Sequence, residues 1–318
     1  MRFWCLKVLL LTTTLVMSGC GNDADAEQYL NAAHSLELQG RWQEAIAQYN
    51  EAVKANPGSA KIYSRRGVAY RQLGKLEQSL DDQNEAIRLD PEYADAYNAK
   101  ALASSNLGNT KSAISALDLA ISIDKTNPEY YVNRGRLYLT IGRLELAAVD
   151  LIESVKLDPN NVETLKLRAQ AYAALGKHEL AISDYSLIIR QYPLEIATYE
   201  QRANSYIELG EYDLSIKDLN RVLQIRPNRA RAYGIRASAL ISLARFVEAV
   251  SDLNTALDID SEYRPAYTTR AIAYTMLGRD LEAQSDIDHA VQLGDERNAI
   301  NKIIENLKKY RSLTTTER

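Results

Sequence analysis

A 34-residue periodicity constrains this chain more than any other feature of its sequence. From residue 26 the same pattern of small, aromatic and turn-forming residues returns eight times, without an insertion, and ends at residue 297. A fixed period of this length is the signature of proteins built by stacking one small structural unit. The predicted repeats are residues 26–59, 60–93, 94–127, 128–161, 162–195, 196–229, 230–263 and 264–297.

Small and turn-forming residues recur at fixed positions of the repeat. The eighth and twentieth positions hold only Ala, Gly or Ser, which lets the two helices of a hairpin pack closely. The fifteenth position is Gly in every repeat except one, where Ala244 stands, as expected where a first helix ends in a left-handed residue. Proline at the thirty-second position of five repeats ends the second helix. Each repeat is therefore predicted to be a pair of antiparallel helices.

Together with Tyr at the fourth position of seven repeats, these positions make residues 26–297 resemble the tetratricopeptide repeat (TPR) family. The resemblance implies an all-α fold, a right-handed α-solenoid (superhelix) of eight TPR helix pairs with a concave groove. Since one repeat cannot bury its apolar face alone, the ends of such a stack need caps. Residues 298–311 are predicted to form a C-terminal capping helix, because their apolar residues share one helical face. Residues 312–318 are predicted to be a disordered tail.

Arginine at the seventh position of six repeats is matched by aspartate at the twenty-third position of the same repeats. The two repeats without the arginine also lack the aspartate. In TPR proteins these positions are usually apolar neighbours on the two helices of a pair, so that one charge there requires the opposite charge beside it. We therefore expect structural ion pairs rather than a phosphate-binding ladder of arginines. The expected pairs are Arg66 with Asp82, Arg134 with Asp150, Arg168 with Asp184, Arg202 with Asp218, Arg236 with Asp252, and Arg270 with Asp286.

Variable positions of the first helix line the concave groove in the TPR family, and here they hold polar side chains of both charges. Such a lining suits an extended peptide, whose backbone amides and charges need partners. The clamp with which some TPR proteins hold a C-terminal carboxylate is matched only in part, by Asn31, Lys61 and Arg65. The alternative is an ordinary solvated polar surface. The predicted groove residues are Asn31, His34, Lys61, Arg65, Asn98, Arg136, Lys166, Gln170, Gln201, Asn204 and Arg231.

The first residues of the chain are predicted to be a bacterial lipoprotein signal peptide. A basic start precedes an apolar run that is too short to span a bilayer. The run ends in MSGC at residues 17–20, which resembles the lipobox of bacterial lipoproteins, although Met17 replaces the usual Leu. The resemblance implies removal of residues 1–19, acylation of Cys20 and attachment to a membrane through lipid. Residues 20–25 are expected to form a short tether.

Composition and residue placement argue against several functions. The formal net charge of −4 does not fit a nucleic-acid-binding surface, which is usually strongly basic. The repeats contain no cysteine, so that neither a disulfide nor a thiolate metal site is expected in them. His34, His178 and His289 lie in well-separated repeats and indicate neither a catalytic triad nor a metal site. Accordingly, we expect no catalytic residue, cofactor or metal.

These observations predict a non-enzymatic, lipid-anchored scaffold that binds peptides or protein segments of cell-envelope partners in its groove, as an assembly factor or adaptor. Because Gly21 rather than Asp follows Cys20, the expected location is the outer membrane, facing the periplasm. One alternative is a structural or oligomerising spacer that acts through the convex face. Another is a cytosolic co-chaperone-like TPR protein, if the leader is not cleaved. The basic residues Arg226, Arg229 and Arg231 are interpreted as a solvated turn.

Overall fold

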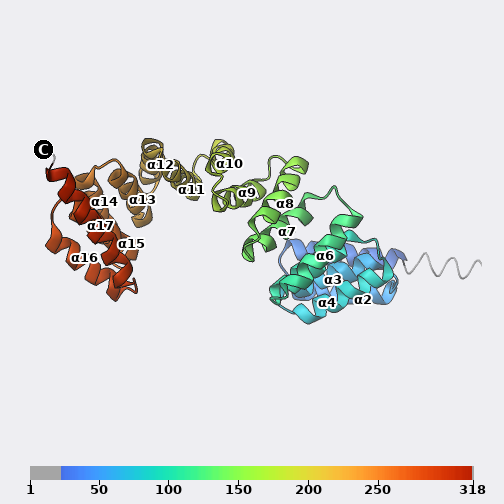
Figure 1. The fold of residues 1–318 in the computed structure, drawn as a ribbon. Coiled ribbons are helices and arrows are strands. Elements are labelled where there is room, and N and C mark those ends of the chain that lie inside the picture. The colour runs from blue at the N-terminus through green and yellow to red at the C-terminus, as the bar shows by residue number, and fades with distance from the viewer. Residues whose placement is uncertain (1–22, 317–318) are drawn as a thin grey trace, which may run out of the picture. The chain divides into compact units, whose positions relative to one another are not determined.

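The computed structural model describes residues 23–316, so the predicted leader and Cys20 lie outside the described residues. The described chain folds into helices joined by short turns (Figure 1). A helix over residues 23–38 comes first. The helices that follow are α2 (Trp42–Ala55), α3 (Ala60–Gln72), α4 (Leu76–Leu89), α5 (Ala94–Asn106), α6 (Thr110–Ile123), α7 (Pro128–Thr140), α8 (Leu144–Leu157), α9 (Val162–Ala174), α10 (His178–Gln191), α11 (Ile196–Glu208), α12 (Tyr212–Ile225), α13 (Ala230–Ser242), α14 (Phe246–Ile259), α15 (Arg264–Met276), α16 (Asp280–Gln292) and α17 (Arg297–Thr316).

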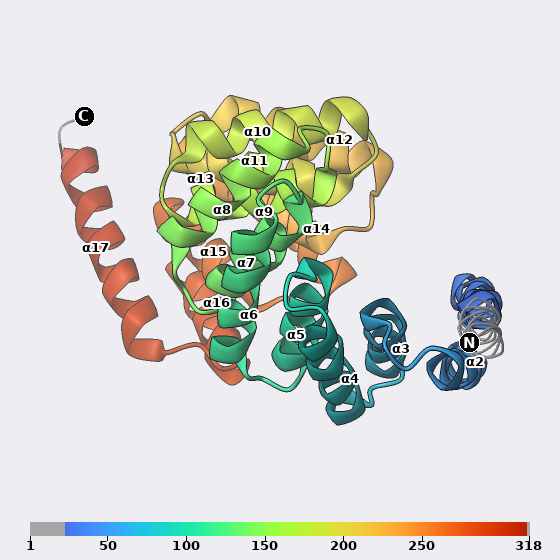
Figure 2. The same ribbon diagram turned by 90° about the vertical axis from the view of Figure 1, so that its right-hand side faces the viewer.

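Successive helices associate in pairs, and the predicted all-α solenoid of eight pairs with a capping helix is confirmed. The described residues form two compact units, which are divided between Thr164 and Leu165. Within the first unit second helices pack against the first helix of the next pair, as α2 does on α3 and, visibly in Figure 2, α4 does on α5. The same rule holds in the second unit, where α12 packs on α13 and α14 on α15. Apolar faces are therefore buried between neighbouring repeats as well as inside each pair.

The turn between the two helices of a pair has one recurring conformation. The glycine at the fifteenth position has a φ between 71° and 79° in all seven repeats that carry it, for example 72° at Gly40 and 76° at Gly210. Ala244 takes the same left-handed conformation, with a φ of 57°, although its side chain disfavours it. The position therefore requires this backbone geometry whichever residue occupies it.

Close approach of paired helices explains the two columns of small residues. Ala33 and Ala45, from the two helices of the first pair, are both fully buried. At Gly67 a Cβ atom would lie 2.4 Å from Nε2 of Gln83 and 3.1 Å from the carbonyl oxygen of Ser79. A larger side chain at this position would push α3 and α4 apart.

Both ends of the described chain are more helical than the sequence indicated. Residues 23–25, predicted to belong to a tether, are helical, and their acidic side chains are compatible with the start of a helix. At the other end, α17 packs on α15 and α16 and continues to Thr316. The prediction of a disordered tail from residue 312 is therefore corrected, because residues 312–316 are helical. Arg311 fastens this last part, because its Nη1 lies 3.1 Å from Oδ1 of Asp280.

Candidate functional site

The six predicted Arg–Asp pairs are each brought together inside one helix pair. In every case Nε and Nη2 of the arginine donate to the two carboxylate oxygens of the aspartate, at distances between 2.6 and 2.8 Å. The aspartate side chains are 3% to 11% exposed and the arginine side chains 16% to 22%. In the second pair of the chain, the hydrogen bonds to Asp82 raise the pKa of Arg66. Such two-pronged contacts hold both side chains in a fixed orientation.

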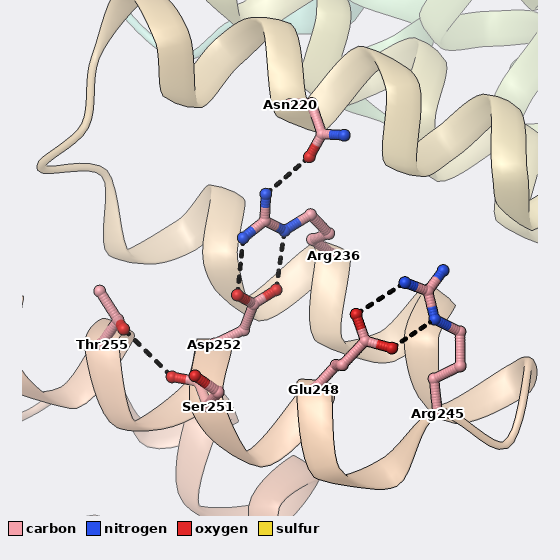
Figure 3. Close-up of polar contacts among 7 residues, drawn as sticks. All are labelled: Asn220, Arg236, Arg245, Glu248, Ser251, Asp252 and Thr255. Carbon is pink, nitrogen blue, oxygen red and sulfur yellow. Dashed lines mark hydrogen bonds and ion pairs between the residues drawn. The ribbon is translucent and has the colours of Figure 1, made fainter.

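Five of these arginines also contact the preceding repeat, which the sequence pattern did not indicate. In Figure 3 the guanidinium of Arg236 lies between Asp252 of its own pair and Asn220 of α12, and its Nη1 donates to Oδ1 of Asn220 at 2.6 Å. Each such arginine thereby fastens two neighbouring repeats. The other contacts of this kind join Arg66 to Asn50, Arg134 to Asp118, Arg202 to Ser186, and Arg270 to Asn254.

Tyrosine rings complete the surroundings of the arginines. The guanidinium carbon of Arg270 lies 5.7 Å from the ring centres of both Tyr267 and Tyr274, which come three residues before it and four residues after it. Arg202 is placed in the same way between Tyr199 and Tyr206. Cation–π contacts of this kind stabilise a guanidinium that is largely removed from water. The structure thus assigns the repeated arginines to the scaffold.

The first helices of consecutive pairs form one surface in each unit, here called the first-helix face, and pockets lie on it. The N-terminal pocket, about 100 Å³ in volume, lies between the helix over residues 23–38 and α3. It brings together four of the predicted groove residues, which are Asn31, His34, Lys61 and Arg65. The match between prediction and structure is closest here.

A buried carboxylate beneath this pocket was not predicted. The side chain of Glu37 is 9% exposed, and its Oε2 lies 3.3 Å from Nδ1 of His34 and 3.9 Å from Nη1 of Arg65. Tyr49, which lines the pocket, is fully buried, and burial together with the Glu37 carboxylate raises the pKa of its hydroxyl. Glu37 therefore supplies a buried negative charge next to His34 and Arg65, which line the pocket.

A second pocket, here called the Arg71 pocket, lies between α3, α5 and α7 and has a volume of about 290 Å³. Arg65 and Arg71 of α3 line it together with Asp95 and Glu129. Nδ2 of Asn98 donates to Glu129 at 3.2 Å. Asn98 was predicted to line the groove, yet it is only 7% exposed. This asparagine forms part of the pocket wall.

A third pocket, here called the Tyr263 pocket, occupies the corresponding place in the second unit. Its volume is about 300 Å³, and it is lined from α11, α13 and α15, including the predicted groove residue Asn204. Gly234 leaves room for the ring of Tyr263, because a Cβ atom at residue 234 would lie 2.7 Å from Cε1 of that tyrosine. Tyr93 and Tyr263 are the last residues of their repeats, so the two larger pockets are built on the same plan.

The remaining predicted groove residues take part in ion pairs or lie on the surface. Arg136 lies 3.2 Å from Glu163, and Lys166 lies 3.0 Å from Glu195. Gln170 on α9 is exposed and Gln201 on α11 is partly buried. These four predicted groove residues therefore do not meet at one site. Two of them form ion pairs, and the other two lie on separate helices.

The interpretation of the basic cluster at 226–231 as a solvated turn needs correction for Arg229. Its guanidinium forms a two-pronged ion pair with Glu200, in which Nη2 lies 2.8 Å from Oε2. Glu200 is 2% exposed, and Arg231 lies 3.9 Å from the same carboxylate. A buried carboxylate on α11 requires a cation, and the residue just before α13 provides it. The contact joins residues 29 positions apart, which explains why local sequence reasoning missed it.

Second helices of the second unit also border clefts, which they share with residues of first helices. A cleft of about 570 Å³ lies beside α12 and is lined by Ile189, Tyr199 and Arg221, among others. A neighbouring cleft of about 300 Å³ is lined by Arg236 and Asp252, whose contacts are drawn in Figure 3. These clefts expose part of the ion-pair network.

Residues 23–316 contain no helix that is both long and apolar enough to cross a membrane. Among the same residues, no three His, Cys, Asp or Glu side chains are grouped as metal ligands would be.

Solved structures with a similar fold are TPR proteins. A TPR protein of Cytophaga hutchinsonii superposes with a TM-score of 0.62 at 18% identity, over 76% of this chain and 98% of that one. PilF of Pseudomonas aeruginosa superposes with a TM-score of 0.54 at 19% identity, over 67% and 96% of the two chains. YrrB, described as a TPR protein with an unusual peptide-binding site, gives 0.53 at 20% identity, over 58% and 95%. At these identities the likeness shows the fold alone.

Family models agree with the structure. A comparison with curated protein sequences found no match. One tetratricopeptide repeat model matches residues 30–94, 132–196 and 201–264, and a second tetratricopeptide repeat model matches residues 94–127. These matches cover most of the described helix pairs, and TPR domains bind proteins and peptide segments. The chain belongs to the tetratricopeptide repeat family.

Proposed function

We propose that this protein is a non-enzymatic, lipid-anchored scaffold that holds extended segments of cell-envelope proteins along its first-helix faces. The observation that carries the proposal is the set of three pockets on these faces. Each pocket is lined by side chains from at least two consecutive repeats, and all three contain polar groups. An extended peptide that crosses successive helices meets such pockets at intervals and places one side chain in each.

The charges of the described groove residues support a peptide rather than a polyanion as the ligand. The N-terminal pocket combines Lys61 and Arg65 with Glu27, and the Arg71 pocket contains as many acids as arginines. Mixed charges fix the register of a peptide, whereas they repel parts of a uniformly charged polymer. YrrB, whose description names a peptide-binding site, offers a precedent for this ligand class within the same fold.

Lipid attachment of Cys20 is the second part of the proposal and is supported by the MSGC sequence at 17–20. Residue 23 is already helical, so that at most two residues, Gly21 and Asn22, separate the acylated cysteine from the first described helix. An extended chain spans about 10 Å from Cys20 to residue 23, which would keep the N-terminal pocket near the bilayer. We place the protein in the bacterial cell envelope, at the outer membrane and facing the periplasm. Its partners would then be envelope proteins that assemble close to the membrane.

Photocrosslinking in intact cells tests the groove. A benzophenone amino acid is placed on the first-helix face at Val68 or Ser238, which line pockets of the two units. Matched controls carry it at Gln78 or Gln284, which are exposed on second helices. We expect discrete adducts from the pocket positions, and charge reversal at Lys61 and Arg65 should weaken capture from Val68. Adducts from the control positions alone would contradict groove binding.

A spacer role through the second helices is the competing function, and the cleft of about 570 Å³ beside α12 is the observation that favours it. In that case adducts arise from the control positions and survive charge reversal in the groove.

The anchor is tested separately by intact mass. We expect the purified membrane form to begin at Cys20 and to carry acyl chains, whereas Cys20→Ala should leave the protein soluble and unacylated.

A further inference from the structure

The guanidinium of Arg71 lacks a hydrogen-bond acceptor. Its Nε is buried without a partner, and no ion pair of Arg71 occurs among the described residues. Burial lowers the pKa of this arginine, and the nearby charge of Glu129 offsets part of that effect. An arginine nevertheless stays protonated in a protein, and a buried charge without an acceptor is costly. The side chain lines the Arg71 pocket, from which an acceptor can approach.

The acids of the pocket do not fill this role. Asp95 accepts a hydrogen bond from the hydroxyl of Tyr130 at 2.5 Å, and Glu129 accepts one from Nδ2 of Asn98 at 3.2 Å. Asn98 is itself held, because Nδ2 of Asn133 donates to its Oδ1 at 2.9 Å. Both carboxylates are hydrogen-bonded to other residues, and no ion pair joins either of them to Arg71 among the described residues, so that Arg71 lacks an acceptor within this part of the chain.

The other groups around Arg71 define the shape of that acceptor. Arg65, on the same helix, is 48% exposed and has only a long contact of 3.9 Å with Glu37. Val68 and Leu102 contribute apolar wall to the same pocket. Two guanidinium groups beside an aliphatic surface match a short methylene stem that ends in a carboxylate, because a carboxylate accepts two parallel hydrogen bonds from one arginine.

We propose that the Arg71 pocket binds the side-chain carboxylate of a glutamate or aspartate in a partner peptide, with Arg71 and Arg65 as its donors. The proposal rests on the proposed groove function and names the partner's chemistry. A phosphate group fits less well, because its double negative charge would face Asp95 and Glu129 within the same pocket. A single carboxylate supplies the missing acceptor with the smallest repulsion from these acids.

Peptide binding by the full chain, followed by fluorescence anisotropy, tests the proposal. The probe is a labelled twelve-residue peptide of alternating Glu and Ala, and its partner has Gln in place of Glu. Both are acetylated and amidated, which removes their terminal charges. We expect the Glu peptide to bind at least tenfold more tightly than the Gln peptide. In Arg71→Gln the ratio should fall below threefold, whereas Arg88→Gln, which removes an exposed arginine from α4, should leave it unchanged.

Two further variants distinguish loss of the carboxylate site from misfolding of the protein. Arg65→Gln changes a half-exposed side chain and should also lower the preference for Glu. Arg71→Lys keeps the charge but loses Nε and should give an intermediate ratio, with thermal unfolding measured for all variants. Equal binding of the two peptides, or an unchanged preference in both Arg71 variants, overturns the carboxylate site. A Gln peptide made with a free C-terminus is a further probe. If it binds as tightly as the amidated Glu peptide, the site is assigned to a terminal carboxylate instead and the proposal is overturned. Groove capture in cells that persists despite these results would leave the scaffold function standing.

Discussion

Asp184 accepts two hydrogen bonds from Arg168, at 2.8 and 2.7 Å, from the facing helix of the same pair. The aspartate side chain is 3% exposed and the arginine side chain 17%. Asp184→Ala leaves a largely buried guanidinium without its partner, and we expect a loss of about 3 kcal/mol in the free energy of unfolding. Urea unfolding followed by circular dichroism measures it.

An exposed ion pair of similar geometry provides the control for this experiment. Glu248 pairs with Arg245 at 2.7 Å, but both side chains are more than 40% exposed. Glu248→Ala should cost much less than Asp184→Ala, because solvent screens an exposed ion pair. Replacing both members of the buried pair, Arg168→Met with Asp184→Leu, should recover most of the lost stability. Equal losses at the buried and the exposed pair would contradict a structural role for Asp184.

Ala244 is expected to be a site where glycine stabilises the protein. It adopts a φ of 57° at a position that glycine occupies in the other repeats. Ala244→Gly should raise the free energy of unfolding by about 1 kcal/mol, since the left-handed conformation is strained for a residue with a Cβ atom. Gly210→Ala is the reverse test, because no atom lies within 4 Å of the added Cβ and the loss is purely conformational. No change in either variant would show that strain is relieved elsewhere.

Glu200 and Arg229 are predicted to depend on each other. Arg229→Ala leaves the 2% exposed Glu200 carboxylate with only the 3.9 Å contact to Arg231. Because Arg229 is 39% exposed, solvent screening reduces the expected loss to about 2 kcal/mol. Adding Glu200→Gln should recover part of it, which a double-mutant cycle measures. Arg226→Ala, at an exposed position, serves as the neutral control.

Buried tyrosines should make the fold sensitive to alkaline pH. Burial raises the pKa of Tyr185 to about 12 from its ordinary value of 10.0. Because the pKa is higher in the folded state, the associated stability is complete below pH 10 and disappears as the pH rises to 12. The loss amounts to at most about 3 kcal/mol. Tyr185→Phe should make the alkaline decline shallower, whereas Tyr192→Phe, at a 54% exposed position, should not.

The repeat pattern made the fold predictable because each structural requirement recurs at one position. Closely packed helices require small residues such as Gly67, and a left-handed turn favours glycine. The C-terminal end was less predictable, since nothing in the sequence after Arg311 stops a helix. Arg311 also contacts Asp280, which lies 31 positions earlier in the chain. Local periodicity carries no information about such a contact.

The candidate site was predictable in outline only. Matched columns within the chain indicated the partner of Arg66, but its contact with Asn50 and its place between tyrosine rings depend on how repeats stack. Arg71 occupies a position that varies among the repeats, and only the structure shows that its Nε is desolvated. Glu37 was not predicted either, because a carboxylate on a helix is normally solvated and only the structure shows that this one is buried.

The residues of the Arg–Asp pairs are separate from the residues that line the three first-helix pockets. None of the twelve members of the Arg–Asp pairs lines one of these pockets among the described residues. The residues that contact a ligand can therefore change from repeat to repeat, in evolution or by design. The ion pairs that stabilise the helix pairs can stay the same. The ligand preference of a single helix pair can be changed independently of the other pairs, provided that its arginine, aspartate and turn glycine remain in place.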